Sequence, residues 1–148
     1  MIQDPIKAGI EDMKVIMSLI AENESLDGKF RARARSLPSL INEIGLVPTL
    51  SFCYGKAEKE VYENVKKCFY ENRKIDKGDE EKKGYALYLL ITLNYLKKLG
   101  LITSTEDVVE VLKQLSGKGE ITYRLLRPYL LQIKRLAEAL FKPESGGT

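Results

Sequence analysis

Apolar residues recur along most of this chain at intervals of three and four, which is the period of an α-helix. Asp4 and Pro5 are typical of a helix N-terminus, because the carboxylate caps free N–H groups and proline suits the first turn. The apolar stripe that follows consists of Ile6, Ile10, Met13, Met17 and Ile20. We therefore expect a first helix that buries this stripe and ends near Asn23, with a turn at residues 25–28.

Prolines and glycines divide the middle of the chain into further helices. Pro38 is expected to open a short helix that Gly45 closes, and Pro48 a second one that Gly55 closes. Residues 85–99 are apolar on nearly every side, which is typical of a helix at the centre of a bundle. The other helices expected in this part cover residues 29–35 and 57–73, with a charged loop at 75–82.

The last third of the chain predicts two more helices. Thr103 and Glu106 have the spacing of a capping box, which would open the first of them. A glycine-containing turn at 116–120 leads to the final helix, expected over 121–141. The final helix contains Pro128 on its basic side, where a bend toward solvent can absorb the lost N–H.

Length and composition agree with one helical domain. The chain has 148 residues, 44% of them hydrophobic and 30% charged. Residues 29–35 alternate strictly and could form a strand with one arginine face, but alanine is a poor strand former and we prefer a helix there. No segment alternates like a convincing half-buried strand. The sequence therefore predicts an all-α fold, a single compact bundle of six to seven helices over residues 1–142, with a flexible C-terminal tail at 143–148. No leader peptide or membrane-spanning apolar run is evident, so we expect a cytoplasmic protein without a membrane partner.

The absence of histidine excludes much acid–base and nucleophilic catalysis. A Ser-His-Asp triad, a Cys-His dyad and a histidine-ligated zinc site all require it. Cys53 and Cys68 are too few for a disulfide framework or a metal centre, and we interpret them as small buried apolar residues, with a reactive thiol as the alternative. The sequence thus predicts a protein that is not an enzyme, with no catalytic residues, no metal site and no cofactor.

Positive charge is concentrated in two stretches, although the net charge of the chain is only +3. Residues 28–42 contain four basic side chains and no acidic one, and residues 121–142 contain five basic side chains and one acid, Glu138. Clustered cations bind nucleic-acid phosphates, and arginine fits phosphate geometry well. The alternative is an ordinary solvated face. The candidate nucleic-acid-binding residues are Lys29, Arg31, Arg33, Arg35, Arg124, Arg127, Lys134 and Arg135.

The helical period sorts these cations into faces. Arg31 and Arg35 share one side of the expected helix, whereas Arg33 lies well round it. On the last helix the basic residues lie opposite a broad apolar arc. The arc consists of Leu125, Leu126, Tyr129, Leu130, Ile133, Leu136, Ala137 and Leu140. Three tyrosines of the central helix are interpreted as core aromatics, with base stacking as the alternative: Tyr85, Tyr88 and Tyr95.

Three functions are compatible with these basic helices. The first is an RNA-complex subunit that binds nucleic acid by shape and charge and leaves sequence reading to base pairing. The second is a helix-turn-helix regulator of DNA, in which residues 105–115 and the helix from Ile121 place Arg124 and Arg127 at the start of the recognition helix. The third is a protein-interaction bundle whose basic faces meet acidic partners.

Two stretches of the sequence resemble one known family. The first covers residues 30–52, where a basic helix is followed by Leu37-Pro38, a short apolar run, Gly45-Leu46 and a second apolar run. The second, residues 123–141, is similar to the C-terminal helix of that family. The family is the small subunit of the Cmr, type III-B, CRISPR RNA-silencing complex. The small subunit of the type III-A complex is a related all-α protein.

The resemblance implies a noncatalytic role in antiviral RNA-targeting defence. Members of the family stack beside the helical backbone subunit, which does the cutting, and flank the guide RNA and its target. The implied partners are other Cmr subunits, above all the backbone subunit, guide RNA, target RNA and copies of the chain itself. By match to the basic signature, RNA or a neighbouring subunit would face Lys29, Arg31, Arg33 and Arg35. The C-terminal helix would supply a second basic surface through Arg124, Arg127, Lys134 and Arg135.

Overall fold

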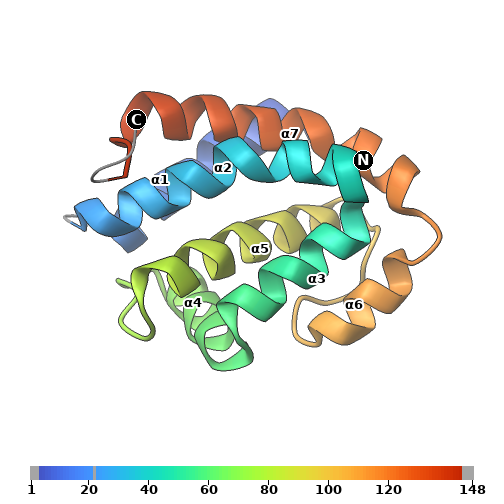
Figure 1. Ribbon diagram of the computed structural model, residues 1–148, viewed down its shortest axis with the longest axis horizontal. Coiled ribbons are helices and arrows are strands. Elements are labelled where there is room, and N and C mark those ends of the chain that lie inside the picture. The colour runs from blue at the N-terminus through green and yellow to red at the C-terminus, as the bar shows by residue number, and fades with distance from the viewer. Residues whose placement is uncertain (1–3, 22, 145–148) are drawn as a thin grey trace.

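Seven helices and no strand make up the part of the chain that the computed structural model describes, residues 4–21 and 23–144 (Figure 1). The predicted all-α fold is confirmed. The helices are α1 (Pro5–Ile20), α2 (Glu24–Ile44), α3 (Leu46–Ala57), α4 (Lys59–Glu71), α5 (Glu80–Lys98), α6 (Val108–Leu115) and α7 (Gly119–Leu140). None of these described helices combines the length and apolar character needed to cross a bilayer. Of the expected tail, residues 145–148 lie outside the described residues.

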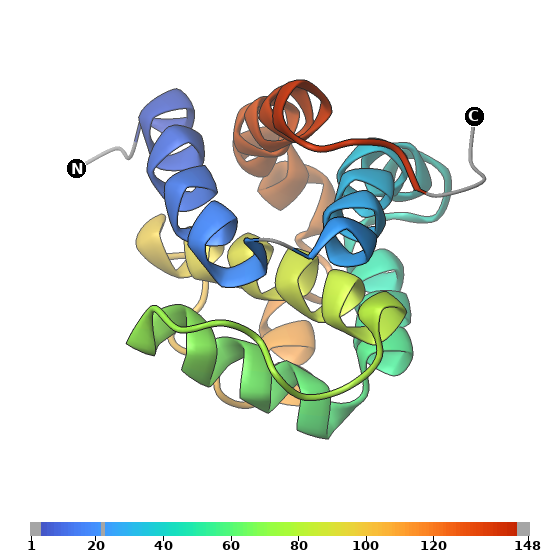
Figure 2. The same ribbon diagram turned by 90° about the vertical axis from the view of Figure 1, so that its left-hand side faces the viewer.

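The central position of α5 follows from its apolar surface, as the sequence predicts. Every residue from Lys83 to Leu96 is buried, and α2, α3, α4 and α7 all pack against this helix (Figure 2). The rings of Tyr85, Tyr88 and Tyr95 are at most 6% exposed. Their interpretation as core aromatics is therefore confirmed, and they do not offer stacking platforms to nucleic-acid bases.

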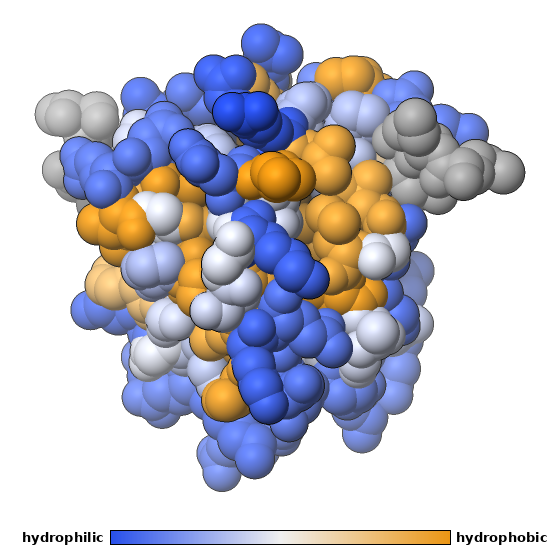
Figure 3. All heavy atoms as spheres, turned by 90° about the vertical axis from the view of Figure 1, so that its right-hand side faces the viewer, coloured by the Kyte–Doolittle hydropathy of each residue, from blue (hydrophilic) through white to orange (hydrophobic). Residues whose placement is uncertain are grey.

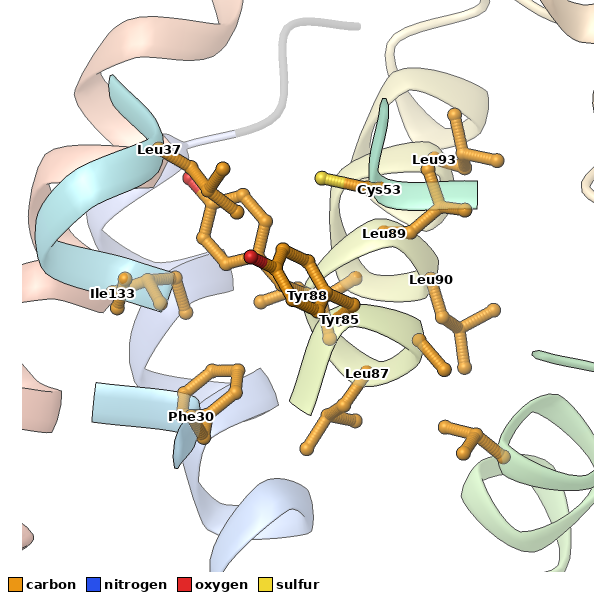
Figure 4. Close-up of a cluster of buried hydrophobic side chains, with 14 of the residues drawn as sticks. Phe30, Leu37, Cys53, Tyr85, Leu87, Tyr88, Leu89, Leu90, Leu93 and Ile133 are labelled. Carbon is orange, nitrogen blue, oxygen red and sulfur yellow. The ribbon is translucent and has the colours of Figure 1, made fainter. Parts of the chain in front are cut away.

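A cluster of side chains from three helices joins α5 to α2 and α7. Figure 4 shows Phe30 and Leu37 of α2, Ile133 of α7 and Tyr88 of α5 converging in the core. The rings of Phe30 and Tyr88 are tilted, with centroids 6.5 Å apart. Burial of an apolar side chain of this size contributes roughly 1.5–3 kcal/mol. Packing thus fixes which faces of α2 and α7 turn inward, and the opposite faces remain at the surface.

The other helices lie in two layers, one on each side of α5. The first layer contains α7 packed between α1 and α2, and the second contains α3, α4 and α6 (Figures 1 and 2). Cys53 of α3 and Cys68 of α4 are fully buried free thiols, which confirms their interpretation as small apolar core residues. Both basic stretches of the sequence belong to the first layer.

A single continuous helix, α2, replaces the turn and two helices expected from the sequence. The turn predicted at 25–28 is wrong, because the Asn23 side chain accepts a hydrogen bond from the N–H of Leu26 and caps a helix that has already begun. The break predicted at Pro38 is also wrong: the ring removes one backbone N–H but is itself buried in the bundle. Gly45, at φ 95°, ends the helix as predicted, and its N–H donates to the carbonyl of Ile41.

The limits of α3 and α6 also differ from the prediction. Gly55 keeps a helical conformation inside α3, which continues to Ala57. Thr103 and Glu106 do not form a capping box. The carboxylate of Asp107 caps α6 instead, by accepting a hydrogen bond in the first turn of the helix, and Thr103 pairs with the Gln114 side chain.

The orientation of α1 about its axis differs from the prediction, because polar and small residues decide which face is buried. Gly9 allows α7 to approach so closely that a Cβ atom there would lie 2.8 Å from Cγ of Gln132. The hydroxyl of Tyr129 donates a 2.5 Å hydrogen bond to Asp12, which is buried and also lies 3.6 Å from Lys98. Three residues of the expected buried stripe are instead 42–44% exposed: Ile6, Ile10 and Met17.

Candidate nucleic-acid interface

The two basic stretches lie on neighbouring helices, α2 and α7, which run side by side in opposite directions (Figure 1). Phe30, near the start of α2, meets Phe141, just after α7, with ring centroids 6.1 Å apart. Further along, the hydroxyl of Tyr123 lies 3.5 Å from the carbonyl oxygen of Pro38. Cations that are far apart in the sequence are thereby placed on one side of the molecule.

Arg33 turns inward and contributes to the packing of the bundle. Its guanidinium carbon lies 4.6 Å from the centre of the Tyr85 ring, and it donates a hydrogen bond to the Tyr85 hydroxyl. Only 20% of the side chain is exposed. Burial raises the pKa of the Cys53 thiol to about 12, and the positive charge of Arg33 opposes part of that rise. Arg33 therefore acts on the interior as well as on the surface.

Two carboxylates of the same chain form ion pairs with three of the four cations on α2. Arg35 pairs with Glu138 of α7 at 3.0 Å. Glu144 lies 3.7 Å from Lys29 and 4.0 Å from Arg33. The absence of acids within residues 28–42 therefore does not leave these three cations unpaired, because both carboxylates come from the C-terminal part of the chain.

Arg31 is the exception on α2. It is half-buried, and it makes no ion pair with a described residue. Its Nε is buried without a hydrogen-bond partner in the described part of the chain. A guanidinium in this state keeps donors available for an anion that approaches from outside.

The cations of α7 are more accessible than those of α2. Arg124, Arg127 and Arg135 are exposed and Lys134 is half-buried. None of the four pairs with an acid within residues 4–21 and 23–144. The basic side that the sequence predicts for the last helix is therefore present at the surface, and its charge is not compensated by those residues.

The apolar arc of α7 is buried along its middle but not near its ends. Leu125 and Leu140, both predicted to be inside, are 49% and 47% exposed. The helix has 22 residues and α1 has 16, so α1 cannot cover its full length. The buried part of the arc consists of Leu126, Tyr129, Leu130, Ile133 and Ala137.

Surface hollows show which of the predicted cations come together. A hollow of about 380 Å³ is lined by Arg33 and Arg35 of α2 and by Lys134 of α7. A neighbouring hollow of about 200 Å³ shares the two arginines and adds Arg31. Half of the predicted residues therefore form one cluster between the helices. The other half do not line these two hollows: Lys29, Arg124, Arg127 and Arg135.

Two residues of this face, Glu144 and Tyr85, are missed by sequence reasoning. Glu144 lies in the stretch interpreted as a flexible tail, and no spacing rule connects it with Lys29 on a distant helix. Tyr85 is predicted to be a core aromatic, and periodicity does not reveal that its hydroxyl would meet Arg33. The only signal in the sequence is an acid that follows Pro143, a residue that restricts the backbone.

The helix-turn-helix alternative is not supported by the packing of α6. This helix has eight residues and packs mainly against α3. In a helix-turn-helix, the two helices joined by the turn form one unit, with the first helix supporting the second. α7 is supported instead by α1 and α2, so its basic residues belong to a different kind of surface.

Comparison with known proteins identifies the family. A model of the family "CRISPR-associated protein (Cas_Cmr5)" matches residues 11–140. The curated protein "CRISPR system CMR subunit Cmr5" of Saccharolobus solfataricus is 30% identical over 124 residues, which cover 77% of this chain and 80% of that protein.

Two solved structures contain chains with the same fold. A chain of the type III-B Cmr-beta complex bound to non-cognate target RNA matches with a TM-score of 0.85 and 28% identity, over 97% of this chain and 100% of that one. A chain of the Cmr-beta complex bound to cognate target RNA and AMPPnP matches with a TM-score of 0.81 and 28% identity, over 93% and 96%. The resemblance drawn from residues 30–52 and 123–141 is thus confirmed, and this chain belongs to the Cmr5 family of CRISPR-associated proteins.

Proposed function

We propose that this chain is the small, noncatalytic subunit of a cytoplasmic type III-B Cmr ribonucleoprotein that targets RNA in antiviral defence. In this role it stacks with copies of itself beside the backbone subunit and contacts guide and target RNA through α2 and α7. The observation that carries the proposal is the set of uncompensated cations on α7, of which Lys134 shares a hollow with arginines of α2. The same fold occurs in chains of RNA-bound Cmr-beta complexes, which supports it.

The basic face suits contact with a phosphate backbone rather than the reading of bases. Phosphate contacts position a nucleic acid without carrying sequence information. The tyrosines of α5 that could stack on bases are buried in the core. Sequence recognition is then left to pairing between guide and target, while this subunit recognises charge and shape.

The chemistry of the chain supports a role without catalysis. It has no histidine, and burial raises the pKa of both thiols, Cys53 and Cys68. No group of three or more potential metal ligands occurs within residues 4–21 and 23–144. Histidine is the side chain that most often serves in general acid–base cleavage, and metal-assisted cleavage needs a group of metal ligands. We therefore assign cutting to another subunit of the complex.

Apolar surface at one end of the bundle supports protein partners. Figure 3 shows apolar side chains gathered in separate patches at this end, divided by a band of hydrophilic residues. Exposed apolar patches on soluble proteins often mark protein interfaces, and stacking between subunits requires such surfaces. The exposed apolar residues on elements that meet at this end include Ile44, Val109, Ile121 and Leu125.

Reversal of two uncompensated charges on α7 tests the proposal. In the variant Arg124→Glu/Arg127→Glu, affinity for single-stranded RNA should fall, and log affinity should depend less steeply on log salt. The slope should lose at least about 1.4, since each phosphate contact on a single strand contributes about 0.7. Fluorescence anisotropy of labelled oligouridylate, titrated from about 50 to about 300 mM NaCl, measures both quantities.

The matched control is Lys59→Glu/Lys67→Glu on α4, which makes the same change in net charge on exposed residues of the other layer. This control should keep most of the affinity and the salt slope. Equal losses in the two variants would show that only net charge matters, and would contradict an RNA-binding face on α7. Cleavage of the labelled RNA by the isolated subunit in the presence of Mg²⁺ would contradict the noncatalytic role.

A further inference from the structure

A short C-terminal strap, residues 141–144, crosses the outer face of α2. After α7 ends at Leu140, the chain passes over to α2 (Figure 2). Phe141 anchors the strap, because its buried ring packs edge-on against Phe30. Glu144 then lies directly over Gly28, where a Cβ atom would come 2.9 Å from Cα of Glu144. Glycine on α2 permits this close approach.

The strap places a carboxylate between two of the cations that we assign to RNA binding. Glu144 lies 3.7 Å from Nζ of Lys29 and 4.0 Å from Nη2 of Arg33. Charge-assisted hydrogen bonds are about 2.7–2.9 Å long, so these two contacts are electrostatic and not hydrogen-bonded. The Glu144 side chain is 34% exposed, and solvent weakens the attraction further. An anion that forms closer contacts can therefore replace it.

The strap also divides a basic trough that would otherwise run along α2. Pro143 and Glu144 line a hollow of about 480 Å³ together with two lysines, Lys29 and Lys142, and one further acid, Glu24. Pro143 and Glu144 also line the neighbouring hollow that contains the arginines of α2. That second hollow shares two arginines with the hollow of Lys134. With the strap lifted, the three hollows would become continuous and would lie along a row of cations.

Unused donors lie beside the strap. The Nε atoms of Arg31 and Arg33 are buried and have no hydrogen-bond partner among the described residues. Unsatisfied buried donors are unfavourable, and phosphate oxygens match the planar donor geometry of arginine. A phosphate group also offers more acceptor oxygens than the single carboxylate of Glu144. The site is therefore more complementary to phosphate than to the group that now occupies it.

We propose that the strap is an autoinhibitory contact, in which the Glu144 carboxylate takes the place of an RNA phosphate on α2 and RNA displaces it on binding. This inference rests on the proposed function and adds a regulatory step to it. In the free subunit the Glu144 carboxylate occupies Lys29 and Arg33, and these two cations of α2 become available when the strap lifts. RNA that reaches both helices displaces the strap and gains the contacts with α2, whereas RNA that reaches only α7 does not gain them.

Gly28→Ala tests this proposal without changing any charge. The added methyl group would clash with the Glu144 backbone and displace the strap, while alanine favours the helical conformation of α2. Affinity for labelled oligouridylate should rise about two- to fivefold, which is the effect of removing weak exposed ion pairs. The salt slope should steepen by about 0.7–1.4 as Lys29 and Arg33 take up phosphates. Circular dichroism checks that the helix content is unchanged.

Glu144→Gln releases the same cations by removing the charge of the strap. Its affinity for oligouridylate should rise as in Gly28→Ala, and the double variant should bind no more tightly than Gly28→Ala alone. The matched control is Glu43→Gln, which removes an equal charge from an exposed position on α2 that has no ion pair with a described residue. This control should bind like the unmodified protein.

Two results overturn the proposal in distinguishable ways. If Gly28→Ala and Glu144→Gln bind RNA no more tightly than Glu43→Gln, while Arg124→Glu/Arg127→Glu still weakens binding, the strap is structural and only the autoinhibition is wrong. If the unmodified protein does not bind oligouridylate, or the α7 variant binds as well as it does, the proposed function fails and the inference fails with it.

Discussion

The cations of α2 and those of α7 form similar clusters in the sequence but differ in the structure. On α2, Arg33 rests on a buried tyrosine, and Lys29, Arg33 and Arg35 face carboxylates of the same chain. On α7, the three arginines are exposed and meet no acid among the described residues. A run of basic residues therefore marks a free binding surface only where the fold brings no acid to it.

The position of each helix in its layer explains the difference. α2 packs against α3, α5 and α7, so long side chains on either side of this helix can reach a neighbouring helix. The aliphatic part of arginine packs readily along such a neighbour, and the guanidinium finds a polar partner there. The outer side of α7 faces solvent along much of its length, and its arginines have no comparable support.

The largest expected effect comes from Phe30, whose ring packs α2 against Tyr88 of α5 and against Phe141, just after α7. Phe30→Ala should lower the free energy of unfolding by about 3–5 kcal/mol, because a fully buried ring between Tyr88 and Phe141 is lost. Urea denaturation followed by circular dichroism measures the loss. Phe52→Ala is the control, since that ring is 40% exposed and should cost far less. Equal losses of stability in Phe30→Ala and Phe52→Ala would contradict the view that packing of its buried face holds α2 in place.

A smaller effect is expected when the inward-facing Arg33 of α2 is compared with the exposed Arg127 of α7. Arg33→Ala should lower the free energy of unfolding by about 1–2 kcal/mol, because it removes the contact with Tyr85. Arg127→Ala should change it by less than about 0.5 kcal/mol, as is usual for an exposed residue. RNA affinity should show the reverse order, with the greater loss in Arg127→Ala. Denaturation curves and anisotropy titrations on the same two variants give both comparisons, and similar losses of stability would remove the distinction.

The parts of this fold that depend on a local pattern of residues can be predicted from the sequence. The apolar surface of residues 85–96 predicts the central helix, and the charge pattern of the last helix predicts its basic side. Prediction from the sequence fails for α1, because the buried carboxylate of Asp12 is stabilised by Tyr129 and Lys98 from distant parts of the chain. It also fails at Pro38, where burial within the bundle outweighs the local tendency of proline to end a helix.

The candidate site also has a part that the sequence predicts and a part that it does not. The eight cations can be chosen from the sequence because charge clustering is a local property. Whether each cation is paired cannot be predicted, because Glu138 and Glu144 are far from residues 29–35 in the sequence and form ion pairs with them only in the folded chain. Pairing of this kind depends on the antiparallel arrangement of α2 and α7, which periodicity alone does not specify.

The smallest expected effect concerns the partly exposed pair of Arg35 and Glu138, which links the two basic helices at 3.0 Å. The Arg35 side chain is 48% exposed and that of Glu138 is 32% exposed, so solvent screens the pair, and Glu138→Gln should lower the free energy of unfolding by less than about 1 kcal/mol. The freed Arg35 lies beside Lys134 in the same hollow, and affinity for oligouridylate should rise about twofold. Glu43→Gln controls for the change in net charge. A loss of stability well above that value, with no gain in affinity, would show that this pair holds the helices together and is not a restraint on RNA binding.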